Sequence, residues 1–167
     1  MNRRRLRLTA AMREQLDHQM ADALALGRAL AGSISEYSQP VRRALRLAYA
    51  MHYGTLLEFF HNGRAPLLPA SAGAREAHQR DIIVSDVLRP GRSLGIAPTV
   101  QDKLRFRAAD RLAAHLSRDR TRCLAGRSEW GNPRDRRAIR RRVKALMVKL
   151  GRTATRLPLT LAELQER

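Results

Sequence analysis

The stretch S-Q-P-V-R-R-A-L-R-L-A-Y-A-M-H-Y-G-T-L-L-E-F-F-H-N-G, from Ser38 to Gly63, decides the fold predicted for this chain. Serine followed closely by proline is typical of a helix start, because serine caps the first turn and proline lacks an N–H that this turn does not need. Mainly apolar side chains, with His52 and Thr55 among them, recur on two faces of this helix: Val41, Leu45, Ala48, His52, Thr55 and Phe59 on one, and Tyr49, Tyr53, Leu56 and Phe60 on the other. A helix that is apolar over so much of its girth is predicted to be central, and Gly63 is predicted to end it.

Two more long helices begin at polar caps. Thr9 is expected to cap a first helix that ends near Gly32, because apolar residues follow it with the helical period. Thr99 and Asp102 have capping-box spacing and predict a third helix that runs to about Thr121. The apolar face predicted for that third helix is Leu104, Ala108, Leu112 and Leu116.

The remaining periodic segments are a fourth long helix and a short one. Asn132-Pro133 predicts the start of the fourth, and Gly151 is expected to end it. Its expected buried face is Ile139, Val143, Leu146, Met147 and Leu150. Residues 81–88 favour a short helix closed by Pro90-Gly91, although three β-branched residues leave a strand open.

Four amphipathic helices with no convincing strand predict an all-α, up-and-down helical bundle. Residues 1–151 are expected to form the single domain of the chain. Residues 152–167 are expected to form a C-terminal tail, in which Thr160 with Glu163 is able to cap a short helix.

Composition narrows the class of protein. The single cysteine, Cys123, excludes an intramolecular disulfide and indicates a reducing, cytoplasmic compartment. The arginine-rich start, residues 3–7, is not followed by the apolar stretch of an export signal, because Glu14, Asp17 and Asp22 interrupt it. No segment has the apolar length of a membrane span, so no membrane partner is expected.

The charge predicts a polyanionic partner. The chain has 33 basic and 15 acidic residues and a formal net charge of +18, which favours nucleic acid. Only three basic residues are lysines, and such an arginine- and alanine-rich composition is also typical of GC-rich coding. Aromatic residues make up 4% of the chain, too few for base-stacking platforms, so contacts mainly to phosphate are expected.

The best candidate site is a stripe of basic residues on the third helix. Its members succeed one another at helical spacing: Arg107, Arg111, His115, Arg118 and Arg122. Histidine titrates near neutrality and guanidinium groups bind phosphate in a fixed fork, so this stripe is able to hold and cleave a phosphodiester. The alternative is that His115, at the border of the apolar face, is a half-buried structural histidine.

A second basic surface is expected on the fourth helix. The basic run there is Arg134, Arg136, Arg137, Arg140, Arg141, Arg142 and Lys144. Arg137, Arg141 and Lys144 are the residues assigned to nucleic acid, and a merely solvated outer face is the alternative.

Three blocks of sequence carry a family resemblance. H-Y-G-T-L-L-E-F-F at residues 52–60, R-D-I-I-V-S-D-V-L at residues 80–88 and D-R-L-A-A-H-L-S-R-D-R at residues 110–120, followed by Trp130, resemble a family of small, uncharacterised bacterial helical proteins. The resemblance covers roughly residues 45 to 150. In arrangement this family is similar to the HEPN superfamily of helical bundles, whose ribonuclease members use an R-x(4–6)-H motif at a dimer interface.

The resemblance implies a metal-independent endoribonuclease that acts as a toxin or phage-defence component, and it favours RNA over DNA as the partner. It assigns His115, Arg111 and Arg120 as candidate catalytic residues, with His52 and Asp110 in support. The chain departs from the family pattern at Gly54, which stands where the H-A-R block has arginine, and only three residues separate Arg111 from His115.

Two other interpretations stay open. One is a non-catalytic helical interaction module that forms a homodimer, and the other is an acid-binding or accessory protein of a mobile element. An antitoxin or a mobile-element protein is a candidate partner. A symmetric homodimer is predicted, because Tyr49, Tyr53, Phe60 and Phe106 exceed what a four-helix core of this length needs. Neither a cofactor nor a metal site is expected, because the histidines lack partners at metal-ligand spacing.

Overall fold

The long helices of the structure form one packed bundle. The computed structural model describes residues 8–32, 34–68, 81–88, 92–114 and 132–153, which contain helices and no β-strand. The long helices are α1 (Ala10–Ala29), α2 (Gln39–Phe60), α4 (Val100–Ala114) and α6 (Pro133–Thr153). The short ones are η1 (Ile34–Glu36), η2 (Ala65–Leu67) and α3 (Val84–Val87). The predicted all-α bundle of about four long helices is confirmed.

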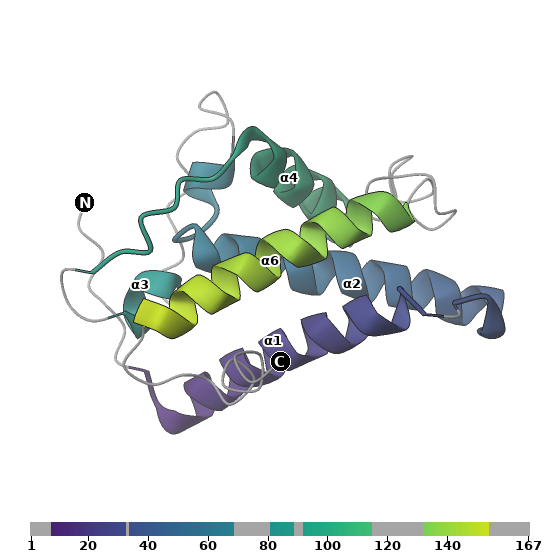
Figure 1. Cartoon of the computed structure of the whole chain (residues 1–167), viewed down its shortest axis with the longest axis horizontal. Helices are drawn as coiled ribbons and strands as arrows, with labels where there is room; N and C mark the ends of the chain where they lie inside the picture. The colour runs from purple at the N-terminus through teal and green to yellow at the C-terminus, as the bar shows by residue number, and fades with distance from the viewer. Residues whose placement is uncertain (1–7, 33, 69–80, 89–91, 115–131, 154–167) are drawn as a thin grey trace.

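The centre of this bundle is α2, as predicted. It packs against α1, α4 and α6, and Figure 1 shows α1 antiparallel to α2, with α6 crossing in front. Tyr49, Tyr53, Phe60 and Phe106 are all buried, with no more than 3% of any of them exposed. The prediction that these four aromatic residues form an exposed interface patch is therefore wrong, because the three helices around α2 cover them within one chain.

Polar caps begin three of the long helices where the sequence predicts them. The Thr9 hydroxyl accepts a hydrogen bond of 3.2 Å from the N–H three residues on. Thr99 and Asp102 exchange reciprocal hydrogen bonds, each 3.0 Å long, between side chain and main chain. The Asn132 side chain accepts a 2.9 Å hydrogen bond at the start of α6. Each cap satisfies N–H groups that have no partner within the helix.

One helix end agrees with the prediction and another differs from it. The last residue of α2 is Phe60, and the turn beyond it has a positive φ at Asn62 (60°) and Gly63 (100°). The Gly63 N–H then donates to the carbonyl of Glu58 at 2.8 Å, which closes the helix end as a C-terminal cap. In contrast, α6 continues past Gly151 to Thr153, because glycine inside a helix costs only about 1 kcal/mol and does not by itself end it.

The short helix is also shorter than predicted, since α3 covers four residues of the expected 81–88. The Asp86 carboxylate accepts a 3.0 Å hydrogen bond from the N–H of Ile83 at its start. Asn62 accepts another, of 3.1 Å, from the N–H of Ser85. The contact from Asn62 ties α3 to the end of α2.

The face that α4 buries differs from the predicted one. Leu112 is buried as predicted, but Leu104 is 43% exposed, and Asp102, Phe106 and Ala109 are buried. Leu116, the last residue of the predicted face, lies outside the described residues. Residues two apart lie on nearly opposite sides of a helix, so burial of Asp102 and Phe106 turns Leu104 outward.

The close crossing of α2 and α4 explains Gly54. A Cβ placed on this glycine would lie 2.8 Å from the Cβ of Ala109, which is too close for two carbon atoms. The arginine that the family pattern has at this position therefore does not fit the structure.

Candidate functional site

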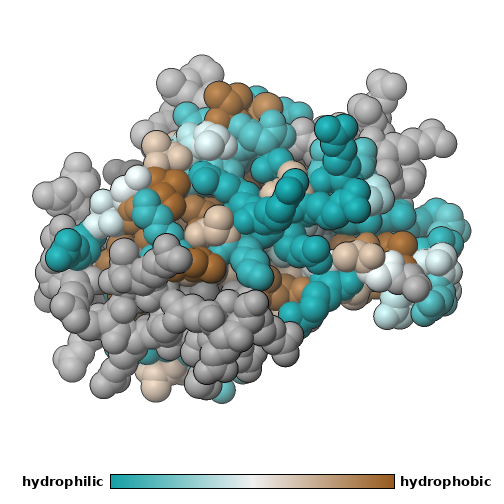
Figure 2. Space-filling view, in the orientation of Figure 1, coloured by the Kyte–Doolittle hydropathy of each residue, from teal (hydrophilic) through white to brown (hydrophobic). Residues whose placement is uncertain are grey.

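The basic run of α6 is divided between an inward and an outward face. The inward residues contact other helices, and they are Arg136, Arg140 and Arg142. The outward residues are exposed, and they are Arg134, Arg137, Arg141 and Lys144. Figure 2 shows hydrophilic residues over much of the surface where α6 lies in Figure 1.

Two of the inward arginines cap the C-terminal end of α1. Arg136 donates to the carbonyl of Leu30 at 3.2 Å, and Arg140 donates to the carbonyl of Gly27 at 3.3 Å. The last carbonyls of a helix lack partners and carry partial negative charge, so cations are favourable there. A Cβ on Gly27 would lie 3.0 Å from the Tyr53 hydroxyl oxygen and 3.2 Å from Arg140 Cδ, which explains the glycine.

A tyrosine pair fills the junction of α1, α2 and α6. The rings of Tyr49 and Tyr53 have centroids 4.3 Å apart. The Tyr49 hydroxyl donates to the main-chain carbonyl of Arg136 at 2.9 Å, and burial raises its pKa far above the ordinary value. The Tyr53 hydroxyl is buried with no hydrogen-bond partner among the described residues, and burial raises its pKa to about 12. Both hydroxyls therefore stay protonated at neutral pH.

The third inward arginine holds a buried carboxylate. Arg142 donates to both oxygens of Asp102, with distances of 2.7 to 3.3 Å, and His61 Nε2 lies 3.4 Å from Asp102 Oδ2. Burial raises the pKa of Asp102, but the nearby His61 ring and the hydrogen bonds from Arg142 and Thr99 outweigh it and hold the pKa well below its ordinary value of 3.8. This network joins α4 and α6 to the C-terminal end of α2.

The capping-box spacing predicted Asp102 only as a helix cap. A signal for its second role was present, because Arg142 lies three residues after Ile139 and four before Leu146, both of them buried. A charged residue at that spacing is directed toward the core and needs a buried partner. The pairing makes Asp102 and Arg142 structural, and neither is available to a ligand.

The outward residues form the most concentrated exposed charge of the described chain. Arg134, Arg137, Arg141 and Lys144 succeed one another at steps of three, four and three, which places them on one face of α6. None of the four has an ion pair with an acidic side chain of the described residues. The face spans about 15 Å at 1.5 Å per residue.

The stripe predicted on the third helix is described only in its first half. Arg107 is half-exposed and Arg111 is exposed on α4. The other stripe residues and the second catalytic arginine lie outside the described residues, and they are His115, Arg118, Arg120 and Arg122. The predicted catalytic constellation therefore stays a prediction.

The two supporting residues do not meet. Asp110 on α4 forms an ion pair with Arg64, which also lies over the ring of Phe106 at 5.4 Å from its centroid. His52 lies instead at the seam of α1 and α2, where it lines a groove with Asp22 of α1. His52 therefore faces α1 while Asp110 pairs with Arg64, and the two supporting residues do not contact each other.

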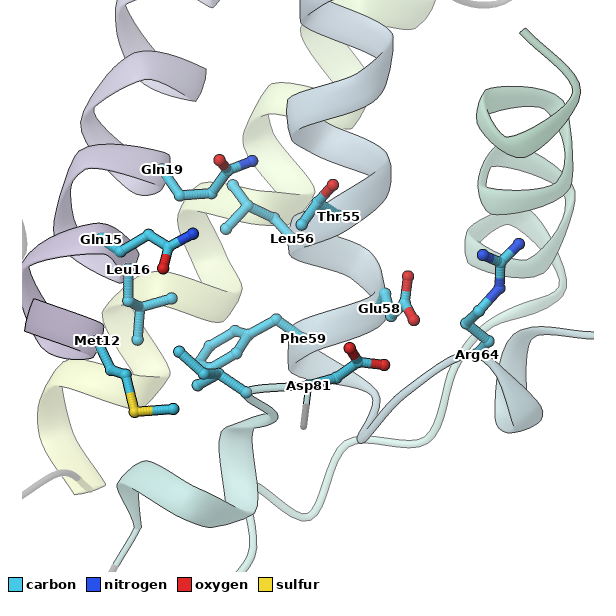
Figure 3. Close-up of a pocket in the computed structure, with 11 residues that line it drawn as sticks. Met12, Gln15, Leu16, Gln19, Thr55, Leu56, Glu58, Phe59, Arg64 and Asp81 are labelled. Carbon is cyan, nitrogen blue, oxygen red and sulfur yellow. The ribbon is translucent and has the colours of Figure 1, made fainter. Parts of the chain in front are cut away.

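A pocket of about 500 Å³ lies between α1, α2 and the segment before α3. Figure 3 shows Leu16, Leu56 and Phe59 at its apolar base, with the carboxylates of Glu58 and Asp81 near one another at its edge. Across the described residues, no three His, Cys, Asp or Glu side chains gather as a metal site would require. No helix of this part of the chain is long and apolar enough to cross a membrane.

Comparison with other proteins adds no constraint. No known protein family, curated protein or solved structure matches this chain. What the chain does must therefore be argued from its own surface.

Proposed function

We propose that this protein binds nucleic acid, with RNA preferred, and that the outward face of α6 contacts phosphates. The observation that carries the proposal is the arrangement of Arg134, Arg137, Arg141 and Lys144, four exposed cations in a row on one helix. Arginine binds phosphate through a bidentate fork, and contacts to phosphate need no exposed aromatic residues.

The division of the basic run of α6 into inward and outward residues favours phosphate binding over a merely solvated face. Nine basic residues and one acidic residue occupy α6, and its three inward arginines already serve the fold. The outward cations have no such role. An exposed row of like charges repels itself, so it lowers the stability of the free protein and is stabilised when a polyanion binds.

Cleavage is a separate prediction. It comes from the family resemblance and from His115, which lies outside the described residues. The α6 face supplies positive charge for binding and no group that titrates near neutrality.

The test compares two double variants with the same change in net charge. In R137E/R141E the outward face of α6 is reversed, whereas R43E/R92E reverses two exposed arginines elsewhere. We expect the first to weaken binding of single-stranded RNA by far more than the second, measured by fluorescence anisotropy. Equal losses in the two variants would show that net charge alone attracts RNA, and would refute an interface on α6.

The salt dependence of the affinity and a comparison of RNA with DNA give two further readouts of the same experiment. Four phosphate contacts predict that log affinity falls with log salt with a slope of about 3. We expect R137E/R141E to reduce that slope by about half. A matched single-stranded DNA tests the preference for RNA, because the 2′-hydroxyl is what distinguishes them; equal affinity would remove the preference and leave the phosphate contacts.

A further inference from the structure

The outer side of α2 is apolar where a surface helix is normally polar. Its residues recur at helical spacing over fifteen positions without a charged side chain: Val41, Ala44, Ala48, Met51 and Thr55. Val41 is 42% exposed and Met51 is 47% exposed. The Thr55 hydroxyl already donates to the carbonyl of Met51 at 3.0 Å, so it offers no free donor. We call these five residues the outer face of α2.

A groove runs beside this face. It has a volume of about 410 Å³, and its lining is mainly small and apolar: Asp22, Ala25, Leu26, Ala29, Ala48 and His52. His52 Nδ1 is buried there and lacks a hydrogen-bond partner within the described residues. Alanine at three of six positions allows another helix to approach closely, because no long side chain keeps the two backbones apart.

Charge restricts what can cover this surface. In a chain of net charge +18, α6 has nine basic residues and one acidic residue, whereas α1 has two basic and three acidic residues. Two copies repel each other strongly through α6 and only weakly through the pair α1 and α2. The excess acid on α1 is also complementary to α2, which has three arginines and one glutamate.

We propose that two copies of this chain associate through the outer face of α2 and the adjoining groove. Tyr53 lies on the side of α2 that packs toward α6, where its hydroxyl and Arg140 both lie close to Gly27. Met51 is two residues before Tyr53, so the outer face lies on nearly the opposite side of α2. Association here leaves both α6 faces accessible. The dimer predicted from the sequence relied on aromatic residues that are buried within one chain. The outer face of α2 is an exposed apolar surface through which two copies can associate.

The test is sedimentation of nucleic-acid-free protein at micromolar concentration. We expect a dimer for the parent chain, and M51E and A48E to raise the dimer dissociation constant by at least ~30-fold, because each buries an unpaired carboxylate in an apolar interface. A145E places the same residue on the exposed surface of α6 and should leave the dimer intact. Circular dichroism and thermal unfolding check that all three variants fold; Met51 is the decisive position, because its side chain is already half-exposed.

High salt separates this dimer from copies bridged by residual RNA. An apolar interface between two positive chains is strengthened by salt, whereas bridging through phosphate is weakened. A parent chain that stays monomeric, a dimer unaffected by M51E and A48E, a dimer lost in A145E, or one that dissociates at high salt would each overturn the proposal.

Discussion

Replacing Asp102 by asparagine should destabilise the protein and change how its stability depends on pH. The substitution keeps the size of the side chain and removes its charge. Asparagine presents an oxygen and an NH2 group in place of two oxygens, so it can accept at the place of Oδ2 but not at that of Oδ1, to which Arg142 Nε also donates. The cation of Arg142 then lies beside the core without a counter-charge.

The expected loss comes from the burial of the pair. Removing one partner of a buried ion pair costs about 3–5 kcal/mol. The Arg142 side chain is 28% exposed and regains some hydration, so we expect about 3 kcal/mol for D102N, the lower end of that range. For a chain of this size that loss lowers the Tm by about 6–12 °C.

The sign of the pH effect is set by the pKa. Hydrogen bonds hold the pKa of Asp102 below its ordinary value of 3.8, so the ionised carboxylate favours the folded chain. This contribution is complete above that ordinary value and is lost as the pH falls through the folded pKa. The gap in stability between the parent and D102N should therefore be constant near neutrality and shrink below about pH 4.

Urea unfolding followed by circular dichroism from about pH 7 to about pH 2 measures this gap. E14Q is the control, because Glu14 is exposed on α1 and removal of its charge should change stability by less than about 0.5 kcal/mol. If D102N is as stable as E14Q at neutral pH, or if its gap from the parent stays constant through the acid range, the carboxylate does not hold the helices together.

Two further pairs of variants test close packing. G54A should lower stability by about 1–3 kcal/mol in thermal unfolding, although alanine has the better helix propensity, since its Cβ would lie 2.8 Å from that of Ala109. G32A is the control and should be neutral or stabilising, because no atom lies nearer than 3.7 Å to its Cβ. Y49F should lower the free energy of unfolding by about 1 kcal/mol, because it removes a hydrogen bond to a main-chain carbonyl of α6. Y53F removes a buried hydroxyl without a partner among the described residues and should lower it by less. A larger loss for Y53F would contradict the assignment of these hydroxyls.

The starts of the helices were predictable because their caps are local. Thr9, the pair of Thr99 and Asp102, and Asn132 each bond to main-chain atoms within three residues, so neighbours in the sequence determine the contact. Helix ends were less predictable. Gly63 acts as a cap and Gly151 does not, since the conformation of a glycine depends on the next residues of the chain and on the elements that pack beside it.

The direction of each face depended on partners far along the chain. The Arg136 side chain reaches a carbonyl 106 residues away, and Arg142 reaches a carboxylate 40 residues away. In the sequence the spacing of Arg142 from Ile139 and Leu146 indicates that it points toward the core, but it does not identify the group that Arg142 binds. The packed helices supply these partners and so separate the structural arginines of the run from the exposed ones.

By itself the sequence determined the class of fold, the number of long helices and the central place of α2, because helical periodicity and caps are properties of short segments. The tertiary structure alone decided which side of α2 and α4 is buried, and which cations remain in solvent. The physical reason is that a buried charge or aromatic ring is stabilised by contacts with several helices at once. No single segment carries the information for such a contact.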